Sequence, residues 1–447
     1  MRTKFSAIAL AAALAATSLS SAAGAADTVG WDIVEDLTTE IGPRLAGSDA
    51  EARARAWAEA RLTALGFSNV MVEPFVLPAW VRGEEKARLT APYQQPLAIA
   101  ALGNSAPTPD KGIEGELVYF PSLAALEAAP AGSLSGKIAF IDHAMMPTMD
   151  GSGYGPFGNA RRRGPSVAAS KGAIAAVIRS AGTDWHRNPH TGATNFAEGV
   201  KPIPAGAVSL PDAELIARVA KRGRPMRLAL TLTGRPAGNM PSGNVVAELP
   251  GRDPSLPLIL VGCHLDSWDL GTGAIDDAAG CAIITAAALR AQAQGQTLRT
   301  IRVLWAGSEE MGGIGGIAYA KRHAAEPHAL AMESDFGADR VWKVEFSLAE
   351  ANKPVADRIA AALAPMGIVH QAGKPTAGTD IAPIVAAQNL ALVRLGQDGT
   401  RYFDLHHTAD DTLDKVDPVQ LEQNVAAWTE VLKIVANEPG PLAGPAK

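Results

Sequence analysis

Charged side chains gather in the middle of the chain, directly after an apolar run. The stretch 262–280 reads GCHLDSWDLGTGAIDDAAG and follows the run LPLILV at 256–261. It contains one histidine and four aspartates. His264 and Asp266 are two residues apart, so in an extended strand their side chains leave on the same face. An imidazole and a carboxylate placed in this way are typical ligands of a divalent metal ion.

Three later segments also carry charge, two of them just after an apolar run and the third before the last expected helix. They contribute Glu309 and Glu310 after RVLWAG, Asp335 after ALAME, and His407 in LHHTADDT. In a parallel α/β sheet the carboxyl ends of the strands meet at one edge, where ligands bind. Carboxylates gathered there repel each other by about 4 kcal/mol per pair at 4 Å and an effective dielectric near 20. The sequence therefore predicts a positive counter-charge at this edge.

Each pattern alone has a plainer interpretation. A His-x-Asp pair is commonly a hydrogen-bonded loop, and Asp276–Asp277 at a helix start is commonly a cap. Together they favour metal binding, and a donor set without thiolate suits catalytic zinc, with manganese or cobalt as substitutes. Five protein ligands exceed what one open tetrahedral ion accepts. They fit two ions that share a bridging carboxylate and a water.

Apolar strands alternate with helices from Val245 onward, which predicts an α/β fold with a mostly parallel sheet flanked by helices on both faces. The expected strands are 256–264, 300–307, 328–335, 342–349 and 390–396, and the expected helices are 277–294, 312–324, 354–363 and 418–435.

A change of pattern near Gly103 predicts a second, smaller domain. Short strands at 115–120, 136–142, 175–180 and 226–233 alternate there with helices rich in small residues. We expect residues 105–237 to form an inserted α/β domain, and residues 27–104 and 238–447 to form a discontinuous catalytic domain. The run Arg161–Arg163 lies in the insert, where a carboxylate-binding role competes with the more common solvated face.

Residues 1–26 are typical of an export signal, with Arg2 and Lys4 before the apolar run 5–16 and small residues at the cleavage point. Without these two cations the net charge changes from −6 to −8, which argues against nucleic acid or an anionic membrane as partner. We expect a soluble chain in the periplasm or secreted. The two cysteines, Cys263 and Cys281, are expected as buried free thiols, with a disulfide as the alternative.

Several motifs, in this order, resemble the co-catalytic (binuclear) zinc exopeptidases, a family that includes secreted bacterial aminopeptidases and plasma glutamate carboxypeptidase, also called carboxypeptidase Q. They are HLDSWD, GAIDDAAG, SEEMGG, MESD, GTD at 378–380 and HHTADDT. The plasma glutamate carboxypeptidase branch is the most similar. The resemblance implies a phosphorylase/hydrolase-like fold with an inserted protease-associated domain where we expect the second domain. Cys263 departs from the small residue that is common in that branch.

The resemblance also implies a role for each motif residue and two Zn²⁺ ions per chain. His264 and Asp335 would bind one zinc, and Glu310 and His407 would bind the other. Asp276 would bridge both ions, and the peptide bond that joins it to Asp277 would be cis. Glu309 would be the general base for a hydroxide between the metals. Asp266 would accept a hydrogen bond from His264 without touching the metal. Asp380 and His406 are expected near the substrate.

The function expected from these features is exopeptidase hydrolysis of dipeptides or short peptides. An aminopeptidase acting on longer peptides stays open, because the residues do not show whether the α-amine or the α-carboxylate of the substrate is bound. Two further alternatives are a catalytically dead binding module and a one-zinc aminoacyl cyclase on the same fold. A homodimer also stays open.

Overall fold

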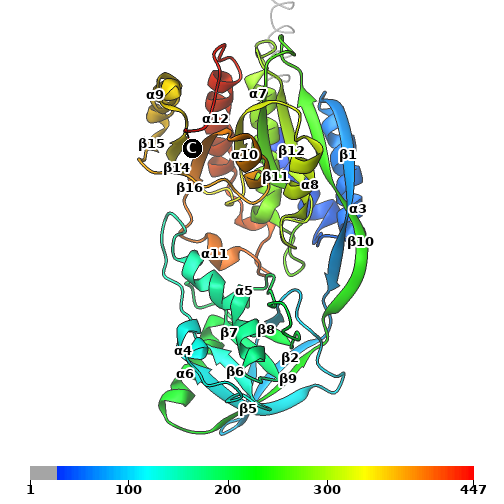
Figure 1. The fold of residues 1–447 in the computed structure, drawn as a ribbon, viewed down its shortest axis with the longest axis vertical. Coiled ribbons are helices and arrows are strands. Elements are labelled where there is room, and N and C mark those ends of the chain that lie inside the picture. Colours follow the sequence, from blue (N-terminus) through cyan, green and yellow to red (C-terminus); the bar gives the residue numbers. More distant parts are fainter. Residues whose placement is uncertain (1–27, 447) are drawn as a thin grey trace, which may run out of the picture.

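Two eight-stranded sheets organise the chain, one above the other in Figure 1. The computed structural model describes residues 28–446. The predicted export signal at 1–26 therefore lies outside the described residues. None of the helices in residues 28–446 combines the length and the apolar character that a membrane-crossing helix needs.

The first sheet has the strand order β1-β10-β12-β11-β13-β16-β14-β15. Its four inner strands, β12, β11, β13 and β16, are parallel to their neighbours in this group. The pairs β1–β10, β10–β12 and β14–β16 are antiparallel, and the pair β14–β15 is parallel. The strand bounds are β1 Ser68–Val81, β10 Arg235–Leu249, β11 Leu258–His264, β12 Ile301–Ala306, β13 His328–Glu333, β14 Val341–Ser347, β15 Val369–His370 and β16 Ala391–Gln397.

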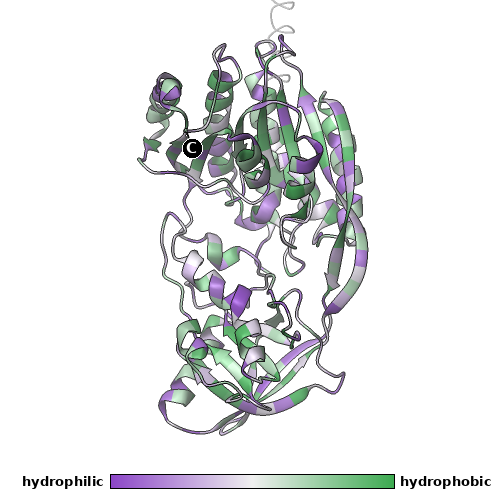
Figure 2. Ribbon diagram, viewed as in Figure 1, coloured by the Kyte–Doolittle hydropathy of each residue, from purple (hydrophilic) through white to green (hydrophobic). Residues whose placement is uncertain are grey.

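Helices cover both faces of this sheet, as predicted. In β11, Ile259 and Val261 pack into one apolar cluster and Leu258 and Leu260 into another, because successive side chains leave on opposite faces. The first face carries α2 Val29–Asp36, α3 Asp49–Ala64, α7 Ala279–Ala291, α9 Lys353–Leu363 and α12 Pro418–Val435, and the second carries α8 Ile314–Arg322 and α10 Ala382–Gln388. Figure 2 colours the inner strands as hydrophobic along most of their length, as expected of strands buried on both faces.

The second sheet has the strand order β3-β2-β9-β5-β6-β7-β8-β4. Its strands are β2 Glu85–Ala91, β3 Gln95–Leu97, β4 Ile99–Ala101, β5 Ile113–Phe120, β6 Ile138–Ile141, β7 Ala175–Arg179, β8 Ala205–Val208 and β9 Met226–Leu232, with helices α4 Leu123–Glu127, α5 Tyr154–Ser170 and α6 Leu210–Lys221. Strands β2–β4 belong to this sheet although they precede residue 105. We call residues 85–232 the second-sheet unit, and the predicted domain boundaries stay a prediction.

Two connections join the sheets. The long antiparallel pair β1 and β10 runs along one side of the molecule toward the second sheet (Figure 1). The short helix α11, Tyr402–Leu405, and the loop after it contact the second-sheet unit: the Phe403 ring stacks on Tyr154 at 4.3 Å, and the Thr191 N–H donates to the His407 carbonyl at 2.9 Å. Loops of both units therefore meet between the sheets.

The expectation of two free thiols is wrong. Cys263 and Cys281 form a disulfide, with their Cα atoms 5.1 Å apart. Cys263 lies next to the last residue of β11 and Cys281 in the first turn of α7, which packs on that strand. The bond therefore joins the strand that ends at His264 to the helix that follows Asp276.

Candidate metal centre

His264 ends β11 and is almost wholly buried. Its Nδ1 lies 2.9 Å from the backbone carbonyl oxygen of Asp266. A carbonyl only accepts, so Nδ1 carries the proton and Nε2 is free to bind a metal ion. Nε2 lies 3.1 Å from Asp276 Oδ1 and 3.4 Å from Asp335 Oδ1. The end of the strand thus presents one imidazole nitrogen to two carboxylates.

Asp276 lies at the centre of the cluster. It belongs to the turn Ala274–Ala278 before α7, and its peptide bond to Asp277 is cis, as the resemblance implies. Its second oxygen, Oδ2, lies 3.2 Å from His407 Nε2, which in turn lies 3.0 Å from Glu310 Oε2. The five predicted ligands therefore form two groups that share Asp276. We call these five residues the ligand cluster.

The donor atoms of the ligand cluster suit a divalent cation. Glu310 Oε1 is buried and has no hydrogen-bond partner among the described residues. Burial raises the pKa of Glu310 to about 7, since nothing in the protein compensates its charge fully. Burial also acts on Asp276, but the neighbouring imidazoles of His264 and His407 outweigh it and hold the pKa of that carboxyl well below its ordinary value. Two imidazoles and three carboxylates without thiolate are ligands that catalytic zinc accepts.

Asp266 supports the centre through both its backbone carbonyl and its carboxylate. Its carboxylate is 3.8 Å from His264 Nδ1, and its backbone carbonyl accepts the hydrogen bond instead. The carboxylate accepts the backbone N–H groups of Glu309 at 3.0 Å and Glu310 at 3.3 Å. Asp266 therefore positions both His264 and the Glu309–Glu310 turn. Asp266 accepts from His264 as predicted, through its backbone carbonyl.

A cavity of about 500 Å³ opens onto the ligand cluster. We call it the large cavity. The first-sheet side contributes Asp276, Glu309, Glu310, Asp335, Thr379, His406 and His407, and the second-sheet unit contributes Asn104, Tyr154, Arg161, Arg162 and Asn195. Burial raises the pKa of Glu309, which lines this cavity beside the ligands, to about 7. A carboxyl group with that pKa is suited to exchange a proton near neutral pH.

The two predicted substrate residues lie in different surroundings. His406 lines the large cavity and stacks on His407 with ring centroids 3.4 Å apart. Asp380 is wholly buried, and its backbone N–H donates to Glu333 at 3.1 Å. Its neighbour Thr379 lines the cavity instead.

Two features of the site were missed or undervalued in the sequence. Arg44 is fully buried, and its guanidinium donates to the carbonyls of Leu265, Thr272 and Gly273 on the two loops that carry ligands. A single arginine in a turn gives no signal of this role. Arg161 and Arg162 line the large cavity, although a run of arginines is more often a solvated face.

Comparison with known proteins defines the class. Residues 244–432 match the model of Peptidase family M28. Carboxypeptidase Q of Bos taurus is 32% identical over 418 residues, which cover 93% of this chain and 86% of that protein. The chain belongs to Peptidase family M28 and is a metallopeptidase, and the predicted resemblance to the carboxypeptidase Q branch is confirmed.

Solved structures agree with this assignment. A Peptidase M28 precursor from Shewanella amazonensis is 44% identical with a TM-score of 0.91, covering 94% of this chain and 96% of that one. A zinc aminopeptidase from Bacillus subtilis, 18% identical with a TM-score of 0.65 and covering 91% and 94% of the two chains, shares the fold. The predicted α/β fold class is confirmed.

Proposed function

We propose that this chain is an exported exopeptidase that holds two zinc ions and hydrolyses dipeptides or short peptides. The position of Asp276 carries the proposal. Its two oxygens face the Nε2 atoms of His264 and His407 at 3.1 and 3.2 Å, each beside a further carboxylate. One carboxylate shared between two ligand groups is the arrangement that two neighbouring ions need. Export is supported by residues 1–26 alone.

The residues of the chain divide the work of hydrolysis. When bound, zinc acidifies a water to a pKa of about 7 and polarises the scissile carbonyl. Glu309 accepts the proton of the attacking water and delivers it to the leaving amine, a role worth about 10²- to 10⁴-fold in rate. The Asp266 carboxylate accepts the backbone N–H of Glu309 and so holds the backbone at this residue. The Glu309 carboxylate therefore stays directed toward the ligand cluster.

Short substrates with a free carboxylate are favoured by the second-sheet unit. It forms one wall of the large cavity, so a long chain has less room there. Arg162 lines that wall, and among residues 28–446 its guanidinium makes no hydrogen bond or ion pair. A terminal carboxylate pairs well with such a group. Arg162 is therefore our candidate for binding the α-carboxylate of a dipeptide.

A panel of blocked and unblocked dipeptides tests this function. We expect the zinc-loaded wild type to cleave Ala-Ala and to lose about 10-fold or more in kcat/KM when the C-terminus is amidated. If N-acetylation abolishes cleavage and C-amidation has no effect, the protein is an aminopeptidase instead.

Glu309→Gln tests the proton transfer. We expect this variant to keep two zinc ions per chain by elemental analysis and to lose about 10²- to 10⁴-fold in kcat. Glu59→Gln, an exposed glutamate on α3, is the matched control and should behave as wild type. A wild-type rate in Glu309→Gln would remove Glu309 from this role, and full activity with one zinc per chain would exclude the binuclear mechanism.

A further inference from the structure

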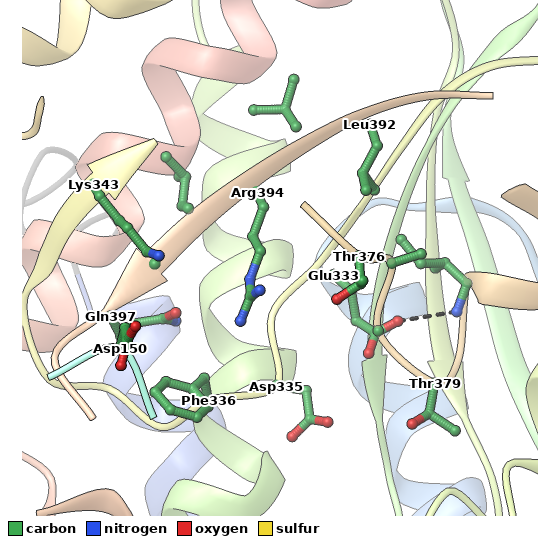
Figure 3. A pocket seen from close by; sticks show the side chains of 16 residues that line it. Asp150, Glu333, Asp335, Phe336, Lys343, Thr376, Thr379, Leu392, Arg394 and Gln397 are labelled. Atoms are coloured by element: carbon green, nitrogen blue, oxygen red, sulfur yellow. Dashed lines mark hydrogen bonds between the residues drawn. The ribbon is translucent and has the colours of Figure 1, made fainter. Parts of the chain in front are cut away.

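A second cavity of about 140 Å³ adjoins the ligand cluster (Figure 3). Its walls are the ends of β13 and β16, the segment 376–379 and part of β14. It shares Asp335, Phe336 and Thr379 with the large cavity. A peptide whose scissile bond lies at the ligand cluster can therefore place a neighbouring group in this second cavity. We call it the Arg394 cavity.

Arg394 is the cation of this cavity that has no partner within the described part of the chain, residues 28–446. It lies on β16, an inner strand between β13 and β14, where Val393 and Leu395 point into the apolar core. By strand alternation Arg394 leaves on the opposite face, and Figure 3 shows it extending into the cavity. Among residues 28–446 its side chain makes no hydrogen bond or ion pair, although it is half-buried. A guanidinium held on an inner strand without an anion is unfavourable unless a ligand supplies one.

The other charged groups that line the cavity are Lys343 and the carboxylates of Asp150, Glu333 and Asp335, and each of them contacts groups of the protein. Asp150 Oδ1 accepts the backbone N–H of Ser152 at 3.0 Å, and Asp335 belongs to the ligand cluster. The Lys343 ammonium lies 3.1 Å from Glu345 Oε2. One oxygen of Glu333 accepts the backbone N–H groups of the 380–381 turn, at 3.1 and 3.0 Å. Arg394 is left as the group that can bind an incoming anion. Its planar guanidinium donates two parallel hydrogen bonds to a carboxylate.

We propose that the Arg394 cavity is a subsite for the side-chain carboxylate of an aspartate or glutamate residue of the substrate. This proposal rests on the peptidase function proposed above. It specifies the substrate class as dipeptides and short peptides that contain aspartate or glutamate. The α-carboxylate has a separate candidate in Arg162, which the second-sheet unit contributes to the large cavity. Arg394 is therefore a specificity-determining residue.

Matched acid and amide dipeptides test the subsite. We expect wild-type kcat/KM for Glu-Ala over Gln-Ala, or for Ala-Glu over Ala-Gln, to be about 10- to 100-fold, because one charged hydrogen-bonded pair is gained. In Arg394→Met this ratio should fall to about one, with zinc content measured to verify the folded metal centre. Arg340→Met, an exposed arginine outside both cavities, is the control and should keep the wild-type ratio.

The outcomes separate the two proposals. If the wild type cleaves none of these dipeptides, the proposed function fails. If the wild type cleaves acid and amide at equal rates, the peptidase stands and the Arg394 subsite is overturned, whether or not the variant folds. If the wild type instead prefers a free C-terminus over an amidated one, and Arg394→Met loses that preference, then Arg394 binds the α-carboxylate of the substrate. The side-chain subsite is overturned in that case.

Discussion

Replacing Arg44 with methionine removes the buried guanidinium that ties together the two loops carrying His264 and Asp276. Its Nη1 donates to the Thr272 carbonyl at 2.7 Å and its Nη2 to the Gly273 carbonyl at 2.9 Å, while Nε donates to the carbonyl of Leu265. A buried acceptor that loses its donor costs about 1–3 kcal/mol. The three losses do not add fully, since neighbouring groups relax together. We expect the free energy of unfolding to fall by about 3–5 kcal/mol.

Urea unfolding followed by tryptophan fluorescence measures this loss. With an unchanged slope, the shift of the midpoint reports stability alone. The control is Arg53→Met, an exposed arginine of α3, which should stay within about 0.5 kcal/mol of wild type. Zinc titration of the folded Arg44→Met protein should also show about 10- to 100-fold weaker binding, because the ligands lose their support.

The Arg44 reasoning has a clear point of failure. If Arg44→Met unfolds at the same urea concentration as Arg53→Met and binds zinc with wild-type affinity, then the guanidinium contributes nothing to either loop. Its burial beside three carbonyl groups would then need another explanation.

Three further predictions follow from the same structure. Asp276→Ala should reduce bound zinc below two ions per chain by elemental analysis after dialysis and abolish peptide hydrolysis, and retention of both ions would refute the shared ligand. The double variant Cys263→Ser/Cys281→Ser should unfold with about 2–4 kcal/mol less stability by urea titration, because the bond closes a loop with a sequence separation of 18; unchanged stability would contradict this. Hydrogen bonds from Arg302 lower the pKa of Glu326 from 4.5 to about 2, so its stabilising effect is present above pH 4.5 and is lost as the pH falls toward 2. Glu326→Gln should therefore lose about 1 kcal/mol relative to wild type at pH 6, since solvent screens this partly exposed pair, and the difference should shrink at pH 3; a constant difference at both pH values would refute the linkage.

The arrangement of the ligand cluster was predictable because it follows from strand polarity. Apolar runs indicated buried strands, and parallel strands must end at one edge. His264 and Asp335 each follow such a run, and the structure places His264 Nε2 3.4 Å from the carboxylate of Asp335. Asp276 joined them because it lies in the turn before α7, the helix that follows β11. The apolar runs and their order along the chain were therefore enough to predict that these side chains lie together.

Contacts between distant segments were not predictable in the same way. The disulfide depends on how closely α7 packs on β11, and no local pattern reports that distance. His264 Nδ1 donates to the backbone carbonyl of Asp266, and its distance from the carboxylate is 3.8 Å. The spacing of the two residues in the sequence does not distinguish these two acceptors. The role of Arg44 depends on three carbonyls more than two hundred residues away in the sequence. Composition and residue spacing do not predict such long-range contacts with the backbone.

The second-sheet unit takes part in the metal centre itself. His407 Nε2 faces Glu310 and Asp276, so His407 can act as a neutral ligand only if Nδ1 keeps its proton. The acceptor available to that proton is the backbone carbonyl of Thr191, 3.3 Å from Nδ1, and Thr191 belongs to the second-sheet unit. Arg161 Nη1 lies closer, 3.0 Å from the same nitrogen, and can donate to Nδ1 only when that nitrogen carries no proton. Thr191 and Arg161 therefore favour opposite protonation states of Nδ1. Both residues belong to the second-sheet unit, so the packing of that unit affects the tautomer of a ligand on the first sheet.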